Sequence, residues 1–201
     1  MMQVVFKGAK VAGLLAVMAL SGCRTEPPDR MQLSFGTYST TPVIILEFTV
    51  NNQATNAGMP SVQQGNADIS PIRASSGSYS GDWPGDPSTV QIDATWVELL
   101  THRAYRAQIV ADTSELPRSP SLGVMVGVTP IFGPHGLMIL AGEEPVANPK
   151  PLDLAQVCGT RQLALDEDFT GDPLAHAGMT EALQIDYPPI ATQTACPEPD
   201  A

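Results

Sequence analysis

The sequence is short of basic residues, of histidine and of recognisable catalytic motifs, and each shortage excludes a class of function. Ten Lys and Arg stand against 21 Asp and Glu, which gives a net charge of −11. A chain with this balance repels nucleic acid and anionic lipid through its general field, so we expect no nucleic-acid partner. The acidic balance suits a cationic partner, but it is also a common solubility device.

Metal and cofactor sites are not indicated. The three histidines are His102, His135 and His176, and no two of them are three or four residues apart. No cysteine lies near them at ligand spacing, so a zinc site would need all three to converge. No glycine-rich phosphate-binding loop is present. We predict neither a metal ion nor a cofactor.

Catalytic motifs are also missing. The sequence contains no Gly-x-Ser-x-Gly and no Ser-x-x-Lys. Its acidic residues lie side by side in DEDF (166–169) and GEEP (142–145), whereas acid–base catalysis needs carboxylates that face each other across a substrate. Neither Cys158 nor Cys196 has a histidine nearby in the sequence to activate it. We therefore predict that the protein is not an enzyme and has no catalytic residue.

The N-terminus carries the strongest motif. Lys7 and Lys10 flank the start of a ten-residue run of apolar residues and Gly, 11–20, which is too short for a hydrocarbon core that needs about 20 residues. Leu20-Ser21-Gly22-Cys23 then matches the lipobox of bacterial lipoprotein signals. The match implies that residues 1–22 are a signal peptide and that Cys23 receives a lipid. The alternative is an ordinary signal peptide or a buried N-terminal helix with an incidental cysteine.

The mature chain that cleavage would leave, and the segment just after the lipobox, together indicate where the protein resides. Cleavage before Cys23 leaves 179 residues with a net charge of −13, because residues 1–22 contain two lysines and no acid. Membrane attachment must then come from the lipid. Residues 23–30 are polar and contain two prolines, so we expect them to form a short tether between the lipid and the folded domain. In enteric bacteria an Asp after the lipidated Cys favours the inner membrane, so Arg24 favours the outer membrane, with the protein facing the periplasm.

The remaining cysteines can be paired. Lipidation of Cys23 leaves Cys158 and Cys196, an even number in a compartment that permits disulfides. We predict a Cys158–Cys196 disulfide, with two free thiols as the alternative.

Residues 31–142 predict an antiparallel β domain, a sheet or a sandwich of hairpins, so the expected fold class is mainly β. Strands are expected in 31–38 and in 42–50, where Ile44, Leu46, Phe48 and Val50 form the core-facing set. A hairpin is expected from the alternating runs 90–96 and 105–111. A second hairpin spans 122–142, with its turn at 133–136.

The region 51–88 reads mostly as a long loop, with one short strand expected near 67–72. Trp83 lies in it between Asp82 and Pro84, in turn-forming sequence that continues to Asp86. An aromatic side chain here is either an anchor for a partner protein or a plug over a sheet edge. We take Asp82, Trp83 and Asp86 as candidate partner-binding residues. Trp96, in contrast, is expected on the core-facing side of its strand.

Residues 143–201 are expected to form an acidic, proline-rich C-terminal extension. Helical spacing occurs in parts of 152–169 and 172–187, with Asp172 as a candidate helix cap, so short helices are expected here. The predicted disulfide would tie this extension back to the β domain.

The block 90–142, together with the 43–50 strand and the lipobox, resembles a group of proteobacterial lipoproteins described only as a domain of unknown function. Their pattern is a Trp-containing strand, a Tyr, an apolar strand, a Pro/Gly turn and a final strand. The inserted IFGPH and the acidic extension depart from that pattern. The matching positions here are Trp96, Tyr105, Leu122–Val128, Pro130 or Pro134 with Gly136, and Leu137–Leu140.

Some lipoproteins of this kind act as immunity proteins for type VI secretion lipase effectors. The resemblance therefore implies a lipid-anchored protein-binding module that inhibits a secreted toxin at the membrane where the toxin works. The alternative is a structural or accessory lipoprotein of a cell-envelope assembly.

Overall fold

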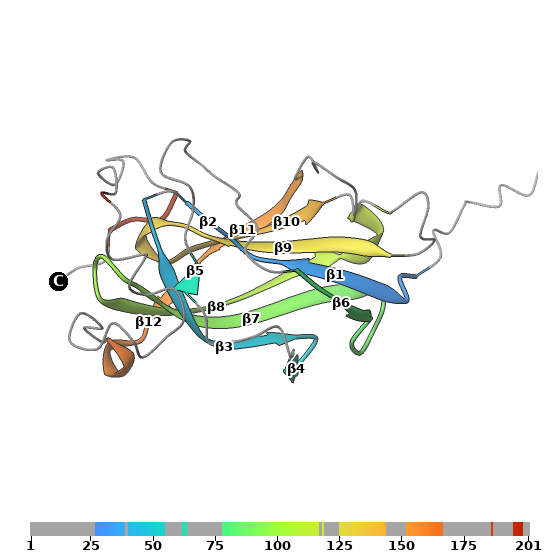
Figure 1. Ribbon diagram of the computed structural model, residues 1–201, viewed down its shortest axis with the longest axis horizontal. Helices are drawn as coiled ribbons and strands as arrows, with labels where there is room; N and C mark the ends of the chain where they lie inside the picture. Colours follow the sequence, from blue (N-terminus) through green and yellow to red (C-terminus); the bar gives the residue numbers. More distant parts are fainter. Residues whose placement is uncertain are drawn as a thin grey trace, which may run out of the picture.

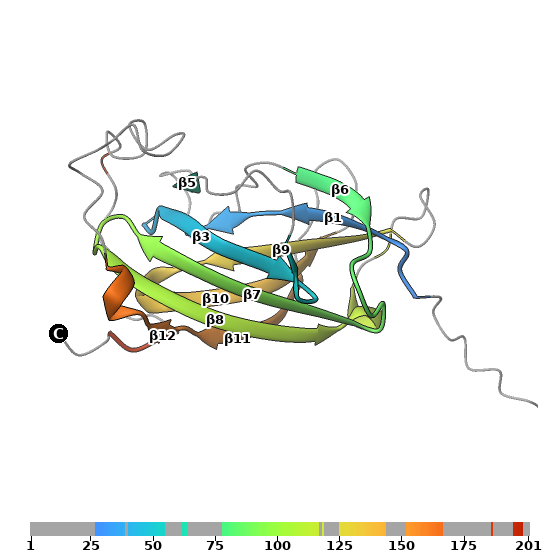
Figure 2. The same cartoon turned by 90° about the horizontal axis from the view of Figure 1, so that it is seen from below.

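A computed structural model describes residues 27–38, 40–54, 62–63, 78–116, 118, 125–143, 152–166, 186 and 195–198. Two sheets form a β-sandwich, seen in two views in Figures 1 and 2. Sheet A has the strand order β11-β10-β9-β1-β6, with β2 also paired to β9, and sheet B has the order β12-β8-β7-β3-β4, with β5 also paired to β3. The mainly β fold class is confirmed.

Most of the strands are short, and the longest belong to sheet B. Sheet A contains β1 (Arg30–Ser34), β2 (Gly36–Thr37), β6 (Ser78–Asp82), β9 (Val126–Phe132), β10 (Leu137–Glu143) and β11 (Leu152–Cys158). Sheet B contains β3 (Val43–Val50), β4 (Gln53–Ala54), β5 (Val62–Gln63), β7 (Thr89–Glu98), β8 (Arg103–Asp112) and β12 (Thr160–Arg161). The helical elements of the described ranges are three single 3₁₀ turns: η1 (Thr113–Glu115), η2 (Pro134–Gly136) and η3 (Leu163–Leu165).

The β7–β8 hairpin follows from strict alternation and confirms the prediction. The apolar residues of β7 that alternate from Val90 to Trp96 are all buried in the core between the sheets, as are those of β8 from Tyr105 to Ala111. Trp96 lies opposite Tyr105 in the register, and their rings stack with centroids 6.0 Å apart. Burial of the large aromatic side chains stabilises this end of the sandwich.

The expected core-facing set of β3 is wrong in its first half. A register shift between Ile45 and Glu47 inserts Leu46 as an extra residue opposite β7. Such a bulge reverses the parity of the strand, because side chains alternate from face to face. Val43 and Ile45, with Phe48 and Val50, therefore face the core between the sheets, whereas Ile44 packs on the outer face of sheet B with Leu46 and three other apolar residues: Val97, Leu99 and Ala104.

The predicted β9–β10 hairpin is confirmed, with η2 as its turn. Every residue of β9 is buried, because both of its faces are covered. One face, including Val128 and Phe132, lies in the core between the sheets. Sheet A is mixed and not purely antiparallel, since β1 runs parallel to β9.

The helical expectation for the start of the C-terminal extension is wrong. Leu152–Cys158 forms β11, which pairs antiparallel with β10, and after Gly159 the chain crosses to sheet B as β12. Sheet pairing therefore continues past residue 142. Three strands, β4, β5 and β6, also lie in the region 51–88, which was expected to be mostly loop. The strand expected at 67–72 lies outside the described residues, as does nearly all of the 172–187 segment.

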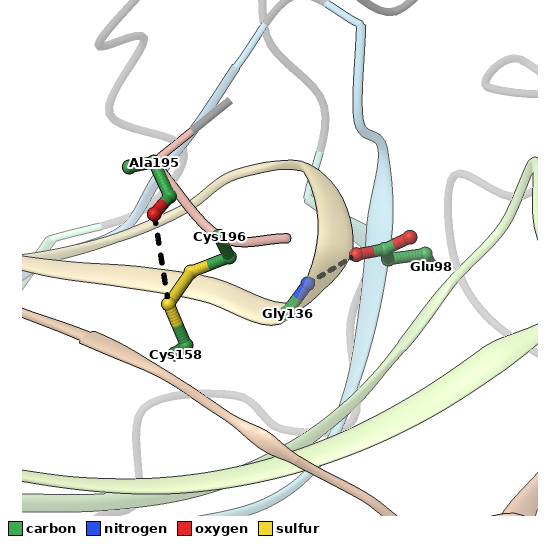
Figure 3. The surroundings of a disulfide bond; sticks show 5 residues. All are labelled: Glu98, Gly136, Cys158, Ala195 and Cys196. Carbon is green, nitrogen blue, oxygen red and sulfur yellow. Dashed lines mark hydrogen bonds between the residues drawn. A yellow bond between two sulfur atoms is a disulfide. The ribbon is translucent and has the colours of Figure 1, made fainter. Parts of the chain in front are cut away.

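The predicted disulfide is present. Cys158 and Cys196 are joined with their Cα atoms 5.6 Å apart. Cys196 is buried on the outer face of sheet A, in a cluster that includes Ile131, Leu137 and Ile139. The disulfide thus brings the segment 195–198 against the β9–β10 hairpin (Figure 3). Among the described residues, no helix is long and apolar enough to cross a membrane.

Candidate functional site

The loop that carries the three candidate partner-binding residues connects β6 to β7. We call residues 82–88 the Trp83 loop. The Trp83 backbone N–H donates to the Asp29 carbonyl oxygen at 2.7 Å, just before β1 begins. The Trp83 ring is half-buried against the core between the sheets, and its Nε1 donates to the Asp86 carbonyl oxygen at 2.9 Å. The ring therefore both caps the core and closes its own loop.

Asn51, which follows β3, holds the Trp83 loop in place. Its Nδ2 donates to the carbonyl oxygens of Pro84, Asp86 and Thr89 at 2.8, 3.1 and 3.0 Å. Its Oδ1 accepts from the Gln91 backbone N–H at 2.7 Å. Asn51 has a φ of 50°, a left-handed conformation that asparagine adopts more readily than most residues. One side chain therefore fixes both ends of the loop.

Two exposed carboxylates project from this fixed loop. Asp82 and Asp86 are both exposed. The Asp86 Oδ1 accepts from the Ser88 backbone N–H at 2.8 Å, and this hydrogen bond lowers the pKa of the Asp86 carboxyl. The Thr113 hydroxyl, at the start of η1, donates to the Pro87 carbonyl oxygen at 2.7 Å and braces the loop from the other side. A carboxylate held in this way, as that of Asp86 is, suits a Lys or Arg side chain of a partner.

The opposite end of the sandwich contains a buried acid that the sequence analysis did not single out. Glu98 ends β7 and is 1% exposed. Its Oε1 accepts from the Gly136 backbone N–H at 2.8 Å (Figure 3). Its Oε2 accepts from the Thr101 hydroxyl at 2.8 Å. Desolvation raises the pKa of Glu98, against the opposing effect of these hydrogen bonds. Glu98 therefore joins the β7–β8 turn to the β9–β10 turn and is closed to solvent.

Tyr105 and Arg161 continue the polar cluster beside Glu98. Desolvation, and then the charge of Glu98, raise the pKa of Tyr105 to about 12. The Arg161 guanidinium lies 5.3 Å from the centroid of the Tyr105 ring. A Cβ at Gly136, where φ is 78°, would come within 2.3 Å of that ring, so only glycine fits this turn. The cluster is tightly packed and structural in character.

The structure separates the predicted site residues between the two ends of the sandwich. Asp82, Trp83 and Asp86 lie at the end where β1 and β7 begin, and the Cys158–Cys196 disulfide lies at the end where β7 finishes. Cys23 and residues 1–22 lie outside the described residues. Within the described ranges, no group of three or more His, Cys, Asp or Glu side chains is arranged to hold a metal ion.

Asn51 and Glu98 hold the two ends of the sandwich in place, but the sequence did not predict these roles, because their hydrogen-bond partners are distant in the chain. The consecutive Asn51 and Asn52 at the end of a strand do signal a left-handed turn, and both have positive φ. Their spacing gave no sign that Asn51 would clamp a loop more than 30 residues away. Glu98 lies two residues beyond the alternating run 90–96, and nothing in its local sequence indicates that it accepts a hydrogen bond from Gly136, 38 residues away.

Comparison of the chain with protein-family models, with curated proteins and with solved structures gave no match.

Proposed function

We propose that this protein is a protein-binding module held at a bacterial membrane by a lipid on Cys23, and that it acts as an inhibitor of a toxic protein that works at that membrane. The membrane anchor is supported by three features in order: a basic start, an apolar stretch and the lipobox that ends at Cys23. The inhibitor role is supported by the resemblance of block 90–142 to a group of lipoproteins of unknown function, because some lipoproteins of this kind act as immunity proteins.

The observation that carries the binding role is the fixed Trp83 loop. Exposed loops that present charged side chains in a set conformation bind partners without a large loss of conformational entropy. Asn51 and Thr113 hold this loop by its backbone, and the hydrogen bond from Ser88 holds the Asp86 carboxylate, while Asp82 stands exposed at the start of the same loop. The strongly acidic chain would also steer a cationic partner towards it.

The anchor places this loop near the membrane surface. Asp29, whose carbonyl oxygen accepts a hydrogen bond from the Trp83 N–H, lies six positions after Cys23 in the sequence. A fully extended segment of this length reaches about 20 Å. A toxin that acts on phospholipid would therefore meet the Trp83 loop close to its site of action.

The test is co-purification of the lipidated protein, solubilised in detergent, with the products of the genes that flank its own. Asp82→Asn with Asp86→Asn should weaken retention of the partner at least tenfold, because both charges are lost. Asn at position 86 keeps the Oδ1 that accepts from Ser88, so the loop conformation is preserved. The matched control is Glu115→Gln with Asp153→Asn, which removes two exposed charges that lie outside the Trp83 loop.

The control variant should retain the partner as the wild type does. Protection of cells against the partner, measured as survival when the toxin is expressed in the periplasm, should fall with the loop variant and not with the control. If no flanking gene product is retained, and cells lacking the protein tolerate every such product, the proposed function is wrong. Incorporation in a large envelope complex that is lost on deletion would favour the structural role.

A further inference from the structure

The outer face of sheet A is apolar where the C-terminal segment 195–198 lies against it. Side chains alternate along β10, so Met138 and Leu140 lie in the core between the sheets. Leu137 and Ile139 lie on the outer face, yet they are only 2% and 6% exposed. A sheet face that stays in water carries mostly polar side chains, so an apolar face such as this one needs a cover.

Cys196 supplies part of that cover. It is completely buried in the outer cluster with Ile131, Leu137 and Ile139, whereas the other three residues of the segment 195–198 are exposed. The core cluster between the sheets, as far as the structure describes it, includes neither cysteine. Departure of Cys196 from the outer face therefore leaves the packing between the two sheets in place.

The bond that holds Cys196 can be reached from solvent. Cys158 is exposed at the end of β11, and its Sγ carries the bond to Cys196 (Figure 3). Exposed disulfides are the more easily reduced ones, because a thiolate has to reach one of the two sulfurs. The segment also makes an ion pair, in which the Glu198 Oε1 lies 3.6 Å from Nη1 of Arg103. The Glu198 side chain is 70% exposed, so this ion pair holds the segment weakly.

We propose that the Cys158–Cys196 disulfide is a redox-controlled clasp, which holds the segment 195–198 against sheet A when oxidised and releases it when reduced. The reductant is a dithiol of the kind carried by protein thiol–disulfide oxidoreductases. Release exposes an apolar strip at Leu137 and Ile139 while the sandwich stays folded. Because the clasp belongs to the folded chain itself, it depends neither on the proposed partner nor on the lipid.

Reduction proceeds by two thiol–disulfide exchanges. One thiolate of the reductant attacks the Sγ of Cys158 and forms a mixed disulfide, and the Cys196 sulfur leaves as a thiolate that takes up a proton. The second thiolate of the reductant then attacks the mixed disulfide and closes the reductant's own disulfide, and the Cys158 sulfur leaves and takes up a proton. Two electrons pass from the dithiol to the disulfide, and the two protons that the dithiol loses balance the two that the cysteines gain.

The first measurement is reduction of the full lipidated protein, solubilised in detergent, by dithiothreitol without denaturant. Alkylation and peptide mass spectrometry should find both Cys158 and Cys196 reduced, and the far-UV circular dichroism should be unchanged. A disulfide that is reduced only after urea is added, or a chain that loses its circular dichroism on reduction, would overturn the clasp.

Cys158→Ser provides the second measurement, because it leaves Cys196 as its own reporter thiol. In the folded variant, Cys196 should react with a maleimide at a rate within tenfold of its rate in urea. Cys196→Ala is the matched control, since the exposed Cys158 should react equally fast in both states. A slower reaction of Cys196 would show that packing alone keeps the segment in place, and the inference would then fail.

Hydroxyl-radical footprinting of the Cys158→Ser variant measures the apolar strip directly. Oxidation of Leu137 and Ile139 should rise at least threefold over oxidised wild type, whereas oxidation of Leu140, on the core face of the same strand, should not change. No rise at Leu137 and Ile139, or an equal rise at Leu140, would contradict a clasp that opens on a folded sandwich. Dithiothreitol-reduced wild type replaces the variant in both measurements if the variant does not fold.

Discussion

At the residue scale, Asn51 makes an unusual number of contacts for a partly exposed side chain. Its amide bonds to the backbone at four positions between Pro84 and Gln91, in the Trp83 loop and at the start of β7. Each such hydrogen bond contributes about 0.5–1.5 kcal/mol. The residue also occupies a left-handed conformation that costs a non-Gly, non-Asn residue roughly 1–2 kcal/mol.

Asn51→Ala should lower the free energy of unfolding by about 2–4 kcal/mol, since both contributions are lost. The matched control is Asn52→Ala, because Asn52 also has positive φ but its Oδ1 accepts only from the Gln91 side chain among the bonds described. The Asn52→Ala control should lower the free energy of unfolding by about 1–2 kcal/mol. Urea unfolding measures both, and equal costs would show that the Asn51 side chain does not fix the Trp83 loop.

Glu98 makes stability depend on pH. Burial raises the pKa of Glu98 in the folded protein, mainly by desolvation. A raised pKa in the folded state means that stability is fully present below the unfolded pKa, about 4.3, and is lost as pH rises through the folded value. Glu98→Gln stays neutral and keeps an acceptor for the Gly136 N–H, so this variant should not undergo that loss.

The prediction is that the difference in unfolding free energy between Glu98→Gln and wild type shifts in favour of the variant as pH rises from about 4.5 to 8. Glu115→Gln, at an exposed position in η1, serves as the control and should run parallel to wild type. Urea unfolding at each pH provides the measurement. A difference that stays constant over this range would mean that Glu98 is not desolvated as described.

At the scale of elements, the sequence predicted the hairpins whose strands are close together in the chain, and it predicted the disulfide. The β7–β8 hairpin follows from alternation over two adjacent strands, and its turn is short enough for neighbouring residues to set the register. The β9–β10 hairpin follows in the same way from an apolar run, a Gly-Pro turn and a second apolar run. The disulfide followed from the even number of cysteines left after the lipobox.

Elements that depend on distant partners were not predictable in this way. β11 has helical spacing in part, and its burial pattern alternates poorly, yet pairing with β10 makes it a strand. The bulge at Leu46 depends on how β3 meets β7, and no residue type in 43–50 marks it. The parallel pairing of β1 with β9 joins segments more than 90 residues apart. Tertiary pairing overrides local propensity in such cases.

The disulfide is the covalent link between the C-terminal segment and sheet A. Cys158→Ser with Cys196→Ala removes a loop constraint over a sequence separation of 38 residues. The chain-entropy estimate for such a loop is about 3–4 kcal/mol, so the unfolding free energy should fall by about that amount. Serine suits the exposed Cys158 and alanine the buried Cys196.

Wild-type protein unfolded in the presence of a reducing dithiol is the matched control, and it should lose a similar amount of stability. Urea unfolding gives both values. A double variant as stable as the oxidised wild type would mean that the segment 195–198 is held against sheet A by other contacts and that the disulfide adds little.

At the scale of the whole molecule, the sandwich has two distinct ends. The Trp83 loop lies beside Asp29, where the chain enters β1, and the Cys158–Cys196 disulfide lies where β7 ends. A lipid on Cys23 would give these ends different surroundings, one at the membrane surface and the other in the periplasm. An acidic sandwich without that lipid would have no attachment to an anionic leaflet, because its charge is repelled there.

The chemistry of Cys23 therefore decides the location of the protein and the surroundings of the Trp83 loop. Intact-mass and peptide mass spectrometry of the protein purified from its own host measures it most directly. We predict an N-terminal peptide that begins at Cys23 and carries the added mass of a diacylglycerol thioether. A peptide that still contains Met1, or one that begins at or after Cys23 without fatty acid, would contradict the account.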